Sequence, residues 1–123
     1  MYFNFLSKYQ LTFIFVLFFS STSFATSEEG AINIGSTMAA GALCEQKGWI
    51  EKYRVMKYMN FFQSNVSEKV WEKFNYGYQN GIKKIAVYSK NHKKWVKFNL
   101  TKKFCQSDID YAIGSYMQRA FPN

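Results

Sequence analysis

The chain has 123 residues, of which 16 are lysine or arginine and 8 are aspartate or glutamate, so its formal net charge is +8. It contains one histidine and two cysteines, too few to assemble an ordinary zinc site once the cysteines pair. His92 stands beside Asn91 and lysines in a sequence typical of an exposed turn, and no set of nucleophile, base and oxyanion donor can be assigned. We therefore expect a basic protein that is not an enzyme and that has no metal and no cofactor.

The first 25 residues have the pattern of a secretory signal peptide. Residues 11–19 form an almost wholly apolar run, with Lys8 before it and small residues after it. A membrane-spanning helix needs about 20 apolar residues, roughly twice the length of this run, so a cleaved leader is favoured over an anchor. Ser23 and Ala25 provide the small side chains that signal peptidase requires, which predicts cleavage before Thr26. We expect a soluble protein in the periplasm or outside the cell.

Residues 26–123 are expected to form one small domain, because 98 residues can bury only one core. Cys44 and Cys105 both belong to it, and export would place them in a compartment where disulfides persist. Their spacing differs from that of reactive thiol pairs, which normally lie two residues apart. The sequence therefore predicts one structural disulfide, which in the chain-entropy model stabilises the fold by about 4 kcal/mol.

Two helices are predicted in the first half of this domain. Residues 28–30 are expected to be a mobile start, and residues 31–47 a helix that is apolar on every side, therefore buried, and ended by Gly48. Its alanines and glycines allow other helices to approach closely. The second helix is predicted over residues 49–63, antiparallel to the first. Its apolar positions at helical spacing are Trp49, Tyr53 and Met56, with Val55, Met59 and Phe62 on an adjoining stripe.

The clearest helical pattern begins at Ser67, whose hydroxyl suits a helix N-cap. One apolar face follows it, made of Val70, Trp71, Phe74, Tyr78, Ile82, Ile85 and Tyr88. Gly77 and Gly81 fall on the same face, where they would admit a close helix crossing at a cost of up to about 1 kcal/mol each relative to alanine. Because the apolar face stays in phase through Tyr88, we expect the helix to continue to Lys90 and an irregular basic segment to follow.

A β-hairpin over residues 84–100 is the main alternative for this region. Its strands would be residues 84–89 and 94–100, joined by a turn at residues 90–93. The last helix is predicted to start at Ser107, with Asp110 completing a capping box, and to end before Pro122. The expected fold class is all-α, a small bundle of about four helices held by one disulfide.

A basic segment is the strongest functional signal in the chain. No acidic residue lies between Glu72 and Asp108, and such a stretch attracts anionic partners. On the helical wheel, Tyr76 points away from the apolar face and lies among lysines, as an aromatic contact residue of a protein interface would. Trp95 and Phe98 either extend this surface or hold the segment to the core. The candidate partner-binding residues are Lys73, Tyr76, Lys83, Lys84, Lys90, Lys93, Lys94, Trp95 and Lys97.

An acidic protein surface is the partner that we expect, with anionic lipid or glycan as alternatives. Nucleic acid is disfavoured by export and by the lack of a recognition motif. Two other functions fit the sequence: a structural or chaperone-like periplasmic protein whose lysines serve solubility, and a secreted effector that acts on a host protein. Asn65 and Asn99 match the glycosylation acceptor pattern, which matters only in a eukaryotic source.

Overall fold

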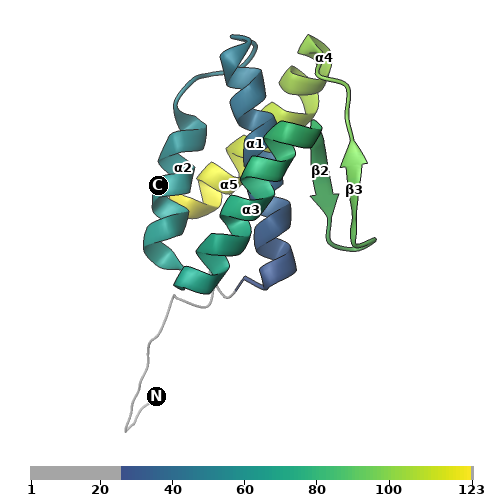
Figure 1. The fold of residues 1–123 in the computed structure, drawn as a ribbon. Helices are drawn as coiled ribbons and strands as arrows, with labels where there is room; N and C mark the ends of the chain where they lie inside the picture. Colours follow the sequence, from purple (N-terminus) through teal and green to yellow (C-terminus); the bar gives the residue numbers. More distant parts are fainter. Residues whose placement is uncertain (1–25, 123) are drawn as a thin grey trace, which may run out of the picture.

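The computed structural model describes residues 26–122 as a bundle of helices with a two-stranded sheet against one side (Figure 1). In chain order the elements are α1 (Glu28–Gln46), α2 (Arg54–Asn65), α3 (Glu68–Lys84), β2 (Ala86–Ser89), β3 (Lys94–Lys97), α4 (Lys102–Phe104), the π-helical turn η3 (Cys105–Ile109) and α5 (Asp110–Ala120). The predicted all-α class with one disulfide is confirmed, and the sheet is a minor part of the fold. The predicted signal peptide lies outside the described residues and stays a prediction.

α1 is the central helix, and its apolar composition explains its position. It contacts α2, α3, α5 and β2, and its middle is fully buried, as predicted. The predicted mobile start is wrong, because the N–H of Gly30 donates to the hydroxyl of Ser27 at 2.9 Å and the helix begins at Glu28. Acidic side chains in this first turn are favourable to the helix dipole. Gly48 follows the last turn with a φ of 75°, which suits the predicted stop.

α1 and α3 run side by side in the same direction, and glycines bring their backbones together (Figure 1). A Cβ atom at Gly35 would lie 2.0 Å from the carbonyl oxygen of Phe74, and one at Gly77 would lie 2.3 Å from that of Ile32. Gly81 is similarly crowded by α1. The predicted close crossing is therefore confirmed. α2 runs back antiparallel to α1, as predicted, but the closest packing of α1 is with α3.

α2 begins at Arg54, later than predicted, and its first turn is held by a side chain of α1. The carboxylate of Glu45 accepts hydrogen bonds from the N–H groups of Tyr53 at 3.2 Å and Val55 at 3.0 Å. It satisfies free donors at the helix start in place of a local N-cap side chain.

The buried face of α2 is also different from the principal stripe predicted. Its buried residues are Val55, Tyr58 and Phe62. Met56 is 64% exposed, and Trp49 and Tyr53 precede the helix. The face of α2 that meets the core is thus the adjoining stripe that contains Val55 and Phe62.

α3 begins as predicted, with the hydroxyl of Ser67 accepting the N–H of Val70 at 3.2 Å. The predicted continuation to Lys90 is wrong. Ile85 adopts a left-handed backbone with a φ of 52° and ends the helix at Lys84. The chain then forms the hairpin that was the alternative, and β2 and β3 pair antiparallel.

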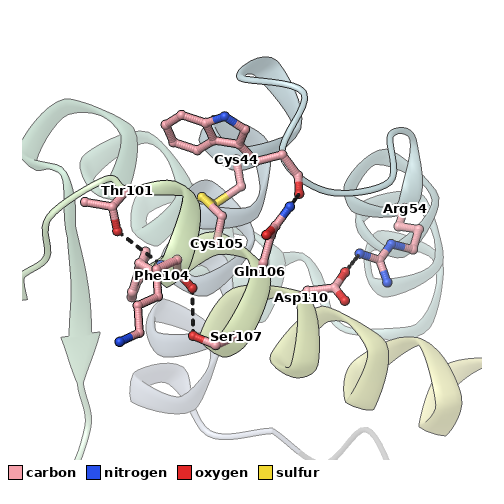
Figure 2. Close-up of a disulfide and its surroundings, with 10 residues drawn as sticks. Cys44, Arg54, Thr101, Phe104, Cys105, Gln106, Ser107 and Asp110 are labelled. Carbon is pink, nitrogen blue, oxygen red and sulfur yellow. Dashed lines mark hydrogen bonds and ion pairs between the residues drawn. A yellow bond between two sulfur atoms is a disulfide. The ribbon is translucent and has the colours of Figure 1, made fainter.

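The C-terminal helical segment starts earlier than predicted and runs without a break through α4, η3 and α5. The hydroxyl of Thr101 accepts the N–H of Phe104 at 3.1 Å and is the N-cap. Ser107 does not cap a helix, because it lies within the segment and its hydroxyl donates to the carbonyl of Lys103 at 2.7 Å (Figure 2).

Cys44 and Cys105 form the predicted disulfide, with Cα atoms 5.6 Å apart, and join the end of α1 to the C-terminal segment (Figure 2). Beside it, the side-chain amide of Gln106 donates to the carbonyl of Trp49 at 3.1 Å. The disulfide indicates an oxidising compartment. No helix between residues 26 and 122 is both long and apolar enough to cross a membrane.

Candidate partner-binding surface

Tyr76 lies on the outer side of α3 and is 51% exposed. The core side of this helix is fixed by Phe74, Gly77 and Gly81, which are buried against α1. Tyr76 is two residues from Phe74, a half-turn away, so the same pattern that buries Phe74 turns Tyr76 outward. Lys73 and Lys83 fall on the Tyr76 side of the helix by the same periodicity.

Trp95 of β3 joins the hairpin to this side of α3. Its ring centroid lies 6.5 Å from that of Tyr76 and 5.5 Å from that of Tyr88, the residue opposite it in the hairpin. The Nζ atom of Lys84 lies over the Trp95 ring at 5.9 Å from its centroid. Trp95 is half-buried, so it both packs the hairpin onto α3 and presents ring surface to solvent. Of the two roles that the sequence left open for Trp95, the packing role is confirmed, and its role in a partner-binding surface stays a prediction.

Five residues from α3 and the hairpin make one continuous patch, which we call the Tyr76–Trp95 surface. They are Tyr76, Lys84, Tyr88, Trp95 and Lys97. Lys97 is included because its Nζ atom donates to the carbonyl of Lys84 at 3.3 Å. The side chains of Lys84 and Lys97 are exposed, so the patch combines accessible cations with aromatic rings.

The hairpin is fixed in this position by two polar side chains of α1. The amide of Asn33 donates to the carbonyl of Tyr88 at 2.7 Å, and the N–H of Tyr88 donates to the hydroxyl of Ser36 at 2.9 Å. Ser36 is fully buried, and its hydroxyl donates a hydrogen bond to the carbonyl of Asn33 at 3.0 Å. Buried hydrogen bonds of this kind are costly to leave unmade, so they hold β2 in register against α1.

Not all of the lysines named from the sequence belong to the Tyr76–Trp95 surface. Lys90 and Lys93 lie in the turn between the strands, and Lys94 is the first residue of β3, opposite Ser89. The Nζ atom of Lys93 contacts both carboxylate oxygens of Glu29 at 2.9 and 3.0 Å, and this hydrogen-bonded partner raises the pKa of Lys93. Lys93 is thus already paired within the molecule. Phe98 stacks on Phe104 with centroids 4.7 Å apart and holds the end of the hairpin to α4.

Sequence reasoning missed Tyr88, Asn33 and Ser36 as contributors to this surface. Tyr88 was assigned to a helix face, although it lies in β2 opposite Trp95. The signal that could have found the other two is the presence of Asn33, Ser36 and Thr37 in a helix otherwise apolar on every side. Polar groups buried there need partners, and an unpaired strand edge supplies them.

Apart from this surface, the structure has a groove of about 620 Å³ between α1, α2 and α3. Its walls are largely apolar and include Val55, Met56, Met59 and Trp71. Glu45 lines it, but its carboxylate is bonded to the backbone at the start of α2. Burial, together with the smaller effect of the Glu45 charge, raises the pKa of the neighbouring Tyr78. The carboxylate of this groove therefore already has a structural role.

Within residues 26–122, no group of three histidine, cysteine or acidic side chains is placed to hold a metal ion. Comparison with protein-family models, with curated proteins and with solved structures gives no match to this chain. The geometry and charge of the Tyr76–Trp95 surface are therefore the features that point to a function.

Proposed function

We propose that the chain is exported through a cleaved signal peptide and works, in the periplasm or outside the cell, as a non-enzymatic binding protein for an acidic partner protein. The contact face is the Tyr76–Trp95 surface, with Lys73 and Lys83 beside it. The disulfide between Cys44 and Cys105 supports the oxidising compartment that this proposal requires.

The observation that carries the proposal is the packing of Tyr76, Trp95 and Lys84 against one another at the surface. Tyrosine and tryptophan supply large contact area at low entropic cost, which is why they anchor protein interfaces. Here the rings are held in place by two elements, α3 and β3, and a cation stands over one of them. A partner that meets this patch gains apolar contact from the rings and charge attraction from the lysines.

A set of four variants tests this proposal by affinity capture from an extract of the source organism. Lys84→Glu and Tyr76→Ala should each release the captured partner, and wild-type capture should weaken as salt rises. Lys52→Glu is the control for charge, because Lys52 is exposed and lies beside the groove between α1, α2 and α3. Tyr111→Ala is the control for the ring, because Tyr111 is 78% exposed on α5.

The controls should retain the partner, since neither residue belongs to the Tyr76–Trp95 surface. Circular dichroism should be unchanged in all four variants, because exposed side chains contribute little to folding. Equal capture by wild type, Lys84→Glu and Tyr76→Ala at physiological salt would contradict the proposal. Binding to anionic lipid vesicles, with no protein captured, would instead assign the surface to a membrane.

A further inference from the structure

Among residues 26–122, the outer edge of β3 has no hydrogen-bonded partner, whereas the outer edge of β2 is bonded to α1. The sheet has two strands, and Figure 1 shows β3 on the outside of the molecule, away from α1. The N–H of Phe98 donates to the carbonyl of Ile85 at 3.2 Å, just beyond the pair formed by Ala86 and Lys97. In an antiparallel ladder the bonded pairs alternate with non-bonded pairs, so Ala86, Tyr88, Trp95 and Lys97 turn their main-chain groups outward.

The two outer edges meet different surroundings. On β2, both main-chain groups of Tyr88 are bonded to α1, through Asn33 and Ser36. On β3, the outward N–H and C=O groups of Trp95 and Lys97 have no partner among residues 26–122. An unpaired edge is a template for another strand, which proteins normally protect with lysines or by covering it. Here no element among the described residues pairs with this edge, and its outward residues, Trp95 and Lys97, belong to the Tyr76–Trp95 surface.

We propose that an extended acidic segment of the partner protein adds to the sheet as a third strand beside β3. This inference rests on the proposed function and specifies how the partner binds. Main-chain bonds to Trp95 and Lys97 would supply affinity, and alternate side chains of the added strand would supply specificity. Acidic side chains on that strand would meet Lys97 and Lys84 on one face of the sheet and Lys94 on the other, because Lys94 and Lys97 are three residues apart.

Charge also argues against a second copy of this chain as the occupant. If two β3 strands paired antiparallel through Lys97 of each, the two Lys97 side chains would lie directly opposite one another, and in any antiparallel register the lysines of both strands would share one short sheet. Like charges directly opposite one another destabilise a strand pair. The same lysines that disfavour self-pairing favour an acidic strand, so one feature accounts for both the free edge and the choice of partner.

Two synthetic peptides separate strand addition from simple charge attraction. The first alternates Thr and Glu and readily forms a strand, whereas the second alternates Pro and Glu and has the same charge but lacks half of its N–H groups. Strand addition requires the Thr-Glu peptide to bind about tenfold or more tightly than the Pro-Glu peptide at the same salt concentration. Equal binding would overturn strand addition and leave the basic surface as the proposed function.

Amide hydrogen exchange locates the binding edge within the same complex. On addition of the Thr-Glu peptide, exchange at the amides of Trp95 and Lys97 should slow by about tenfold or more, because they gain partners. The amide of Val96 faces β2 and is the internal control, whose exchange should change little. Slower exchange at lysine-bearing regions away from β3 would contradict the proposal. So would slow exchange of the Trp95 and Lys97 amides in the absence of peptide, if it is accompanied by formation of a dimer.

A pair of variants at one position tests the contribution of the main chain. Lys97→Gln removes the charge and keeps the outward N–H, whereas Lys97→Pro removes both, and proline is tolerated at strand edges. The proline variant should bind the Thr-Glu peptide about tenfold more weakly than the glutamine variant. Equal affinity in folded variants would overturn strand addition, and if the proline variant does not fold, the peptide pair and the exchange measurement decide. Failure of both peptides and of the captured partner to bind would instead contradict the proposed function.

Discussion

Tyr58 lies in the core with 5% of its surface exposed, and its ring packs against that of Tyr116 with centroids 5.6 Å apart. Burial disfavours the charged phenolate, and with Tyr116 nearby it raises the pKa of Tyr58 to about 12 from the ordinary value of 10.0. The unfolded chain therefore loses this proton at a lower pH than the folded one. Between about pH 10 and 12 the folded state binds more protons, so the free energy of unfolding falls as pH rises.

Tyr58→Phe should remove this part of the alkaline loss of stability. We expect similar free energies of unfolding for wild type and variant at neutral pH, and a variant that loses about 1 kcal/mol less per pH unit above pH 10. Urea unfolding measured at several pH values checks this. Tyr111→Phe is the matched control, since Tyr111 is exposed and should leave the wild-type slope unchanged. A Tyr58→Phe slope equal to that of wild type would show that other groups control the alkaline transition.

At the scale of elements, the close crossing of α1 and α3 depends on glycine. Gly77→Ala would place a methyl group 2.3 Å from the carbonyl oxygen of Ile32, a distance that only a backbone shift can relieve. We expect the free energy of unfolding to fall by about 2 kcal/mol or more. Gly114→Ala is the control, because nothing lies within 4 Å of the added atom, and there alanine should be neutral or stabilise the helix by up to about 1 kcal/mol.

Urea denaturation of both variants measures these two free energies. The opposite signs distinguish a packing requirement from the general preference of helices for alanine. A Gly77→Ala protein as stable as Gly114→Ala would mean that α3 can move away from α1 without cost, and the crossing would not be a fixed feature of the fold.

The helices that the sequence predicted well are those with local signals. Ser67 caps α3, Gly48 follows the end of α1, and the glycine spacing on α3 predicts the crossing, because each effect needs only neighbouring residues. The end of α3 was mispredicted because Ile85 is an apolar, β-branched residue in a left-handed conformation, which such residues rarely adopt. Its side chain also continued the helical pattern, so nothing local indicated a stop.

The remaining errors come from contacts between elements distant in sequence. The start of α2 depends on Glu45, which belongs to α1, and the sequence around Arg54 contains no equivalent N-cap side chain. Likewise, β2 is held by Asn33 and Ser36 across more than 50 residues of chain. The candidate surface was therefore predicted in part: Tyr76 and Trp95 followed from periodicity and charge, whereas the contact between them depends on a hairpin that only the tertiary structure shows.

At the scale of the whole molecule, the disulfide joins α1 to η3. These two elements pack against each other less extensively than α1 and α3 do. Cys44 and Cys105 are separated by 61 residues, and closing a loop of that length removes about 4 kcal/mol of unfolded-state freedom in the chain-entropy model. Small domains have a total stability of about 5–15 kcal/mol, so this bond supplies a large share. The surrounding contacts, from Gln106 to Trp49 and from Arg54 to Asp110, are individually weaker (Figure 2).

The double variant Cys44→Ala with Cys105→Ala should therefore unfold at a much lower urea concentration, with a loss of about 4 kcal/mol in the free energy of unfolding. Both sulfur atoms are buried, so part of any loss comes from core packing. Wild type reduced under native conditions is the matched control, because it keeps the sulfur atoms and loses only the bond. Thiol labelling of the untreated protein should find no free cysteine. Quantitative labelling of both thiols in folded protein, or equal stability of reduced and untreated wild type, would show that the bond does not hold the bundle together.

Reduction of the disulfide should leave partner binding at the Tyr76–Trp95 surface unchanged, at temperatures below the melting temperature of the reduced protein. The rings of this surface are positioned by α3 and the hairpin and not by the disulfide.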